Sequence, residues 1–181
     1  DTTTFAKQLY EKKVNANMIA LLVAPPEPKF AELGEACISV VGSSQWEPQA
    51  TYSTESAKKA GMEYFGITVE DFIKSYKAKY DGETPSYHSA GGYAAGLILQ
   101  KAIQEAGSTD TAKVKEVLDK MNMMTFYGVI KFDDSPKAHG LQVGHDMVYI
   151  QWQKGKDGKP AKQVVWPEAA ATASAMVCPA R

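Results

Sequence analysis

Two apolar runs near the start of the chain predict strands that are buried on both faces. Residues 18–23 are continuously apolar and residues 37–41 nearly so, over lengths typical of strands. A threonine-rich cap precedes them and begins a predicted helix, which carries Phe5 and Leu9 four residues apart. Three prolines in residues 24–28 separate the two strands, because proline continues neither a helix nor a central strand.

The middle of the chain has the periodicity of helices. One helix starts at a capping pair, Thr68 with Asp71, and a second is predicted over residues 86–106, with Gly107 ending it. Asp110 caps a third predicted helix. The apolar stripe that the first of these helices would bury consists of Val69, Phe72, Ile73, Tyr76 and Tyr80.

The first half of the second helix consists of unusually small residues. Residues 90–96 contain three glycines. Each glycine inside a helix costs about 1 kcal/mol relative to alanine. Such a cost implies that a close approach of the backbone is useful there. Either another helix packs against this segment, or the small residues leave space beside a ligand.

The last third of the chain predicts strands again. Residues 127–133 form an apolar strand punctuated by glycine, and residues 147–153 and 164–166 predict the two arms of a hairpin. β-Branched and aromatic residues dominate both arms, and the glycine- and lysine-rich residues 154–160 supply the turn. Strands, then helices, then strands, without an internal repeat, predict an α/β protein.

The order of motifs in this last third resembles the C-terminal end of a known family. A Tyr-Gly segment that ends in Lys-Phe-Asp (residues 127–133) precedes a Gln-Trp-Gln arm (151–153) and a closing Val-Trp-Pro (165–167). This succession is similar to that of the type 1 periplasmic solute-binding proteins, the leucine/isoleucine/valine-binding family of ABC-importer receptors. Residues 85–88 and 106–110 fit the same family. The resemblance implies a binding protein rather than an enzyme.

The resemblance also implies a fold and a division of the chain. Members of the family have two Rossmann-like α/β lobes joined by a hinge, hold the ligand between them, and are much longer than this chain. On that template residues 1–45 belong to the C-terminal lobe, and residues 46–126 supply helices to the N-terminal lobe. Residues 127–181 return through the hinge and add a hairpin and a tail. The chain would then be a C-terminal half, and the N-terminal half would be a companion chain or be exchanged in a domain-swapped dimer.

Composition limits the partners of this chain. Its net charge is −1, whereas nucleic acids and anionic membranes attract a basic surface, so we expect no nucleic-acid partner. No apolar run approaches the roughly 20 residues of a membrane helix, and no signal peptide opens the chain, so we expect a mature or trimmed form. Cys37 and Cys178 are too few for a disulfide framework; free thiols and a bridge, to each other or to a cysteine elsewhere, are both open.

Few groups in the sequence could support catalysis or bind a metal. The histidines are His88, His139 and His145, and no ligands have the spacing of a zinc site. No nucleophile elbow, P-loop or dinucleotide-binding glycine motif occurs. We therefore expect no enzymatic activity, no cofactor and no metal.

Aromatic and polar groups at the ends of predicted elements are the candidate ligand contacts, because ligand clefts of open α/β folds are lined there. Trp46 leaves the second strand in a polar segment and is either a packed loop residue or an aromatic wall for a ligand. Tyr87 and His88 begin the small-residue helix, whose N-terminal amides favour anions. The resemblance places His88 at an aromatic ligand contact of the family; a structural role is the alternative.

The resemblance also points to the loop after the first strand. Pro26-Glu27 is similar to a Pro-Glu pair of the family, whose carboxylate receives the ammonium group of branched-chain amino acids. Glu27 is therefore the expected partner of a ligand ammonium group; a solvated loop carboxylate is the alternative.

The resemblance implies an extracytoplasmic solute-binding component of an ABC importer, in the periplasm or associated with the outer face of the membrane. It would capture a small amino acid or an organic acid, for example an aromatic one, and deliver it to a membrane permease. A ligand-sensing domain of the same fold, in a receptor or a regulator, is the alternative.

Overall fold

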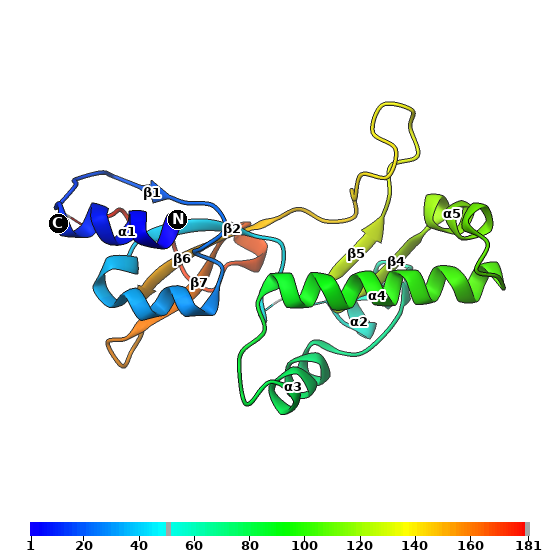
Figure 1. The fold of residues 1–181 in the computed structure, drawn as a ribbon, viewed down its shortest axis with the longest axis horizontal. Coiled ribbons are helices and arrows are strands. Elements are labelled where there is room, and N and C mark those ends of the chain that lie inside the picture. The colour runs from blue at the N-terminus through cyan, green and yellow to red at the C-terminus, as the bar shows by residue number, and fades with distance from the viewer. Residues whose placement is uncertain (50–51, 180–181) are drawn as a thin grey trace. The chain divides into compact units, whose positions relative to one another are not determined.

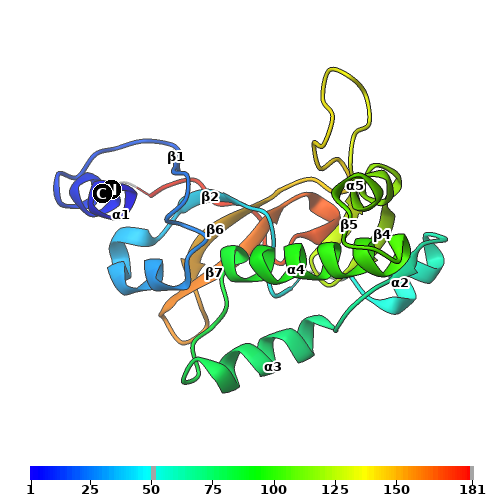
Figure 2. The same ribbon diagram turned by 45° about the vertical axis from the view of Figure 1, so that its right-hand side comes forward.

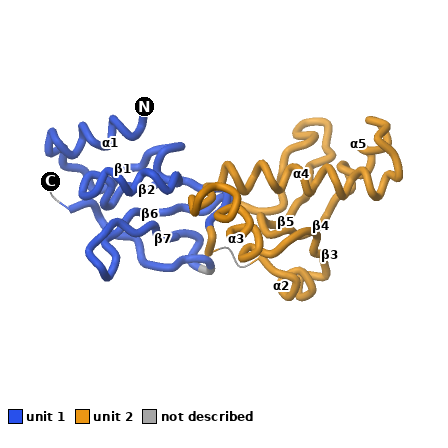
Figure 3. The backbone as a smooth tube through the Cα atoms, turned by 60° about the horizontal axis from the view of Figure 1, so that its bottom comes forward, with its two compact units in different colours: residues 1–47, 147–181 blue, residues 48–146 orange. Residues whose placement is uncertain are grey.

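The computed structural model describes residues 1–49 and 52–179, and the chain divides into two compact units. The order of the elements can be followed in Figure 1. Unit 1 consists of residues 1–47 and 147–181, and unit 2 of residues 48–146, as Figure 3 shows by colour. Unit 1 is therefore assembled from both ends of the chain, whereas unit 2 is continuous.

Unit 1 is built on a four-stranded sheet of order β1-β2-β6-β7. β1 (Ile19–Ala20) pairs in parallel with β2 (Val40–Ser44). β6 (Val148–Lys154) pairs antiparallel with both β2 and β7 (Pro160–Trp166). β6 and β7 form the hairpin that the sequence predicted, and this prediction is confirmed.

Two helical segments pack against each other beside this sheet (Figure 2). They are α1 (Thr2–Glu11), whose predicted helix is confirmed, and the 3-10 segment η1 (Pro28–Cys37). The short segment η2 (Glu168–Ala170) follows β7. The Asp1 carboxylate caps α1 by accepting a hydrogen bond from the Thr4 N–H at 2.9 Å. The apolar core of unit 1 includes Ala6, Phe30, Cys37, Val40, Ile150, Trp152 and Val164.

Unit 2 contains a three-stranded sheet of order β3-β4-β5. β3 (Glu63–Tyr64) pairs in parallel with β4 (Asn122–Thr125), which pairs antiparallel with β5 (Gly128–Lys131). The long helix α4 (Tyr87–Ala106) lies against this sheet in Figures 1 and 2. Its contact with the sheet is an apolar cluster, to which α5 (Thr111–Lys120) contributes, and the cluster consists of Ala102, Val114, Met121, Met123 and Ile130.

The helices predicted for the middle of the chain are confirmed, together with their caps. Thr68 Oγ1 accepts a hydrogen bond from the Asp71 N–H, and Asp110 Oδ1 accepts one from the Lys113 N–H, each at 3.1 Å. Gly107 ends α4 in the left-handed conformation, with φ of 57°. None of the helices in the described part of the chain combines the length and apolar character that crossing a bilayer requires. The remaining helices of unit 2 are α2 (Thr54–Lys59), α3 (Val69–Lys79) and α5 (Thr111–Lys120).

The first predicted strand forms only in part. β1 covers Ile19 and Ala20, whereas Met18, Leu22 and Val23 are 66%, 68% and 60% exposed. The prediction of a strand buried on both faces is wrong here. β1 is the edge strand of its sheet, so no strand in the described part of the chain covers its outer side.

The second predicted strand is displaced along the sequence. Cys37 ends η1 instead, and its Sγ donates to the Gly34 carbonyl oxygen at 3.0 Å. Ser39 has a φ of 68°, which is incompatible with a strand. For that reason β2 begins only at Val40 and extends to Ser44.

The chain returns to unit 1 later than the sequence indicates. β5 pairs with β4 inside unit 2, and the following segment folds back onto β5. Gln142 holds it there: its Oε1 accepts from the Lys131 N–H at 3.0 Å, and its Nε2 donates to the Val129 carbonyl oxygen at 2.8 Å. The crossing back to unit 1 therefore falls at Met147 rather than near Tyr127.

The small residues of α4 have different surroundings. A Cβ added at Gly91 would lie 3.3 Å from the Tyr127 hydroxyl oxygen, so the backbone approaches that ring closely. A Cβ added at Gly92 or Gly96 would meet no atom of the described residues within 4 Å. Within this part of the protein, therefore, no other helix packs against these two positions.

Candidate functional site

Hydrogen bonds from the β6-β7 hairpin hold the loop that carries the predicted contacts Pro26 and Glu27. Trp152 Nε1 donates to the Pro25 carbonyl oxygen at 2.8 Å, and Lys162 Nζ donates to the Pro26 carbonyl oxygen at 2.6 Å. Pro25 and Pro26 are fully buried, while Glu27 is partly exposed. Two donors of β6 and β7 thus fix consecutive carbonyls next to the glutamate.

A buried ion pair lies beside this loop. Glu47 is only 3% exposed, and its Oε2 lies 2.7 Å from Lys162 Nζ. Burial raises the pKa of Glu47; the Lys162 charge acts in the opposite direction, and the negative charge of Glu27 raises it further. Glu47 therefore lies between the opposite effects of a lysine and of a second carboxylate. The sequence analysis missed Glu47 and Lys162, since nothing distinguishes them from surface charges in the sequence.

Trp46 is buried, with 2% of its surface exposed. The Ser44 hydroxyl donates to its backbone oxygen at 2.8 Å at the end of β2. The indole is therefore part of a packed segment, and its role as an aromatic wall for a ligand stays a prediction.

Tyr87 and His88 lie in the first turn of α4, as predicted. Their ring centroids are 4.0 Å apart with an interplanar angle of 32°. His88 is exposed and Tyr87 is half-buried. Unit 2 therefore presents an aromatic pair at the positive end of a long helix, where anions are favoured.

Tyr127 is a neighbour of Tyr87 in this aromatic pair. The sequence indicated it only as the start of a strand. Burial and then the neighbouring Tyr87 raise the pKa of Tyr127 to about 12, so its hydroxyl is a protonated hydrogen-bond donor at neutral pH. In the sequence, Gly128 directly after Tyr127 could have indicated this crowded environment. Glycine in a strand often marks a place where another group approaches the backbone closely.

His145 packs over that glycine. A Cβ on Gly128 would lie 2.5 Å from the His145 ring, which also meets the rings of Tyr127 and Tyr52 at 5.6 and 6.0 Å. Nδ1 of His145 donates to the Asp146 carbonyl oxygen at 3.0 Å, and Nε2 is buried without a hydrogen-bond partner among residues 1–49 and 52–179. The carbonyl fixes Nδ1 as the donor, so Nε2 of the neutral ring is an acceptor.

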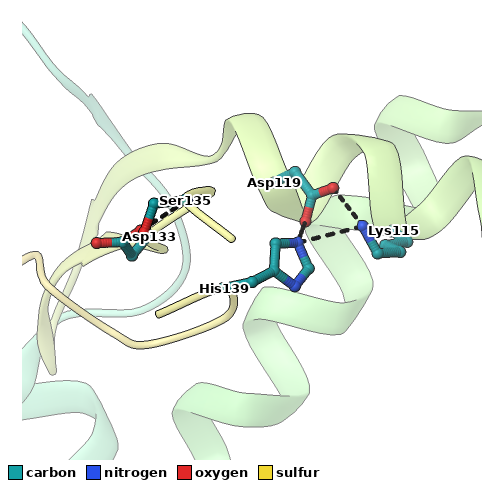
Figure 4. Close-up of polar contacts among 5 residues, drawn as sticks. All are labelled: Lys115, Asp119, Asp133, Ser135 and His139. Atoms are coloured by element: carbon teal, nitrogen blue, oxygen red, sulfur yellow. Dashed lines mark hydrogen bonds and ion pairs between the residues drawn. The ribbon is translucent and has the colours of Figure 1, made fainter. Parts of the chain in front are cut away.

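A second polar group in unit 2 links α5 to the segment after β5 (Figure 4). Asp119 accepts from Lys115 at 2.6 Å and lies 2.9 Å from His139 Nε2; these contacts, that of Lys115 first, lower the pKa of Asp119. Nearby, Asp133 Oδ1 accepts the Ser135 N–H at 2.7 Å. Since these side chains are at least partly exposed, they anchor a loop rather than form a reactive centre.

The cysteines are separate thiols in this structure. Cys37 and Cys178 are both buried and free, and the Ser39 hydroxyl donates to Cys178 Sγ at 3.0 Å. Burial raises the pKa of the Cys37 thiol to about 11, so it is not a reactive thiolate. Within residues 1–49 and 52–179 no group of three or more His, Cys, Asp or Glu could hold a metal ion.

The sequence profile of the periplasmic binding protein family matches residues 1–159, which is most of the chain and reaches into both units. The chain belongs to the periplasmic binding protein family. This confirms the family resemblance seen in the sequence. The family is generally non-enzymatic, in line with the absence of catalytic motifs from the sequence.

Relatives with curated names include Leu/Ile/Val-binding protein homologs 7 of two Brucella species. The Brucella suis protein is 31% identical over 129 residues, and the Brucella melitensis protein 28% identical over 124. Each match covers 68% of this chain and 30% of the relative. The chain thus matches about a third of the length of these proteins.

Solved structures confirm the fold. A leucine-binding protein LivK from Thermotoga maritima superimposes with a TM-score of 0.61 at 23% identity, over 92% of this chain and 42% of that one. A periplasmic binding protein from Burkholderia mallei gives 0.67 at 22% identity, over 99% and 44%. The chain has the α/β fold of type 1 periplasmic binding proteins and corresponds to a part of it.

Proposed function

We propose that this chain is part of an extracytoplasmic solute-binding protein of an ABC importer, which captures a small amino acid or an organic acid between two lobes. The family match over residues 1–159 carries the proposal. The names of the Brucella proteins refer to leucine, isoleucine and valine, and that of the Thermotoga maritima protein refers to leucine, which favours an amino acid. Function is then binding coupled to hinge bending, without covalent chemistry.

Each unit contributes candidate contacts to this function. In unit 1, Glu27 receives the ligand ammonium on a loop shaped by Pro26, and Trp46 offers an aromatic face. In unit 2, Tyr87 and His88 contact the ligand from the first turn of α4, where the helix dipole favours a carboxylate. The fixed carbonyls of the Pro25-Pro26 loop support this assignment, because a ligand contact must be held in a defined place.

The remaining parts follow from the same proposal. Unit 1 belongs to the C-terminal lobe and unit 2 to the N-terminal lobe. An N-terminal half, in a companion polypeptide or exchanged in a dimer, completes both lobes. The exposed Met18, Leu22 and Val23 beside the edge strand β1 support such a companion, because this edge would accept further strands. A membrane permease receives the ligand.

Isothermal titration calorimetry on the complete protein tests the ligand class, with leucine, isoleucine, valine and aromatic carboxylates as probes. Glu27→Gln should weaken amino-acid binding by about 1.5–3 kcal/mol, as for a lost hydrogen bond to a charged group. Glu32→Gln, at an exposed glutamate of η1, is the matched control and should bind normally.

Two results would contradict the proposal or redirect it. Saturable binding of none of these solutes would contradict solute capture. Binding by the protein, together with unimpaired uptake by cells that lack it, would instead favour a ligand sensor over an importer component.

A further inference from the structure

The loop that carries Glu27 lies against a glycine in the middle of β2. The chain leaves the sheet after Leu21, whose N–H still donates to the Val41 carbonyl oxygen at 2.9 Å, and then folds back over β2. A Cβ added at Gly42 would lie 2.7 Å from Cβ and 3.1 Å from Cγ of Pro25. Carbon atoms in contact are normally about 3.5–4 Å apart. Pro25 therefore occupies the place of the side chain that Gly42 lacks.

The backbone of Gly42 does not itself require glycine. Gly42 is buried inside β2, pairs in register with Ile150, and does not have the positive φ that other glycines of this chain have. Alanine could adopt the same backbone conformation. Glycine inside a strand often marks a place where another group approaches closely. Here that group is Pro25, with the Leu21 carbonyl oxygen 3.2 Å from the same point.

The turn that leads into this loop is strained. Val23 has a φ of 70°, which a β-branched residue rarely adopts, and the Ala24 N–H donates to the Leu22 carbonyl oxygen across it at 2.9 Å. Val23 is 60% exposed, so burial of its side chain does not account for this conformation. Such conformations persist where the surrounding structure fixes them. The loop is therefore held by the groups on which it rests.

Two supports act on Pro25. Gly42 allows its ring to lie directly on the sheet, and Trp152 Nε1 donates to its carbonyl oxygen at 2.8 Å. A methyl group at position 42 would push the ring outward by about 1 Å. This displacement would break the hydrogen bond from Trp152 and would move Glu27, which follows two residues later.

We infer that Gly42 is a positioning residue for the ligand. Because it lets Pro25 lie directly on β2, it places the Glu27 carboxylate where a ligand ammonium group binds. This role rests on the proposed function, in which Glu27 receives that group. Gly42 touches no ligand itself and acts through Pro25, so its replacement should displace the carboxylate without removing it.

The position of the loop can be measured on the complete protein without any ligand. The NMR signal of the Trp152 indole N–H reports its hydrogen bond to Pro25. Gly42→Ala should shift this signal and accelerate its exchange with solvent, because the carbonyl oxygen moves away. Ser43→Thr is the matched control, since it adds one methyl group on the opposite face of the same strand, and it should leave the signal unchanged.

Calorimetric titration of the same variants with leucine, isoleucine and valine measures the effect on binding. Gly42→Ala should weaken binding of these amino acids about tenfold or more, and Ser43→Thr should not weaken it. In the Glu27→Gln background Gly42→Ala should have no further effect, because the carboxylate that it displaces is absent. If Gly42→Ala does not fold, Pro25→Gly removes the ring from the other side of the contact and should weaken binding with the same dependence on Glu27.

The role of Gly42 would be overturned by an unchanged Trp152 signal in Gly42→Ala, or by wild-type affinity of the folded variant. Equal weakening in the wild-type and Glu27→Gln backgrounds would also overturn it, since Gly42 would then act through another group. Binding of aromatic carboxylates alone would do the same, because they carry no ammonium group. Failure of the proposed function is a distinct result: the wild-type protein would bind none of the solutes, and the Trp152 signal would still shift in Gly42→Ala. The ligand role of Gly42 would then fall with the proposed function, and its support of the loop would remain.

Discussion

Replacing Lys162 by methionine is expected to destabilise unit 1 by about 3–5 kcal/mol at neutral pH, the typical cost of removing one partner of a buried ion pair. Lys162 is 15% exposed and Glu47 3%, and their charged atoms are 2.7 Å apart. Methionine keeps most of the volume of lysine but leaves the Glu47 carboxylate buried without its counter-ion. The Pro26 carbonyl oxygen also loses its donor.

The loss should depend on pH, because Glu47 can escape it by taking up a proton. Burial raises the pKa of Glu47 above its ordinary value, so between these two pKa values the folded state retains a proton that the unfolded state has already released. Stability then falls as pH rises from the unfolded pKa through the folded one. Without Lys162 the pKa of Glu47 rises further and this interval widens. The loss of unfolding free energy caused by Lys162→Met should therefore be larger near pH 7 than near about pH 5.

Urea denaturation followed by far-UV circular dichroism at both pH values measures these differences. Lys154→Met is the matched control on the same hairpin, because its ion pair with Glu35 is 56% exposed on both sides and should contribute less than about 1 kcal/mol. The double variant Glu47→Gln/Lys162→Met should recover much of the loss, since no charge stays buried. The argument is refuted if Lys162→Met costs no more than Lys154→Met, or if the double variant is no more stable than Lys162→Met alone.

Three further predictions concern other parts of the chain. Gly128→Ala should destabilise unit 2 by about 1–3 kcal/mol in urea, because its φ is 142° and the His145 ring occupies the place of a Cβ; wild-type stability would show that the ring moves aside easily. Trp46→Ala should lower ligand affinity in calorimetry by roughly 1–3 kcal/mol, and unchanged affinity in a folded variant would exclude a ligand contact. Light scattering of the isolated chain should show association, because β1 presents an open sheet edge; a monodisperse, cooperatively folded monomer would contradict the need for a companion half.

Local signals in the sequence were sufficient for the helices and the hairpin. Thr68 and Asp110 cap the helices that follow them, and Gly107 ends one, because each acts on backbone groups within its own turn. The hairpin was equally accessible, since alternating aromatic and β-branched arms around a glycine-containing turn pair with each other.

Predictions that depended on distant neighbours failed. The apolar residues 18–23 have the composition of a central strand, but β1 lies at the edge of its sheet. Burial on both faces requires elements packed against both faces of the sheet, and a run of apolar residues cannot reveal whether these exist. Gly92 is a similar case: a glycine in a helix indicates that space is needed, but not whether another helix or a ligand would occupy it.

The candidate contacts could be found from the sequence, but the groups that hold them in place could not. The sequence pointed to Glu27 and to the Gln-Trp-Gln arm of the hairpin as unrelated features. In the structure Trp152 of that arm and Lys162 of the opposite arm hold the carbonyls of Pro25 and Pro26, next to Glu27. The hairpin is therefore more than a closing element of the sheet. Lys162 also pairs with the buried Glu47, at the point where the chain leaves unit 1. A change in the charge of this pair should therefore alter the hydrogen bond of Lys162 to Pro26 and with it the position of the loop that carries Glu27.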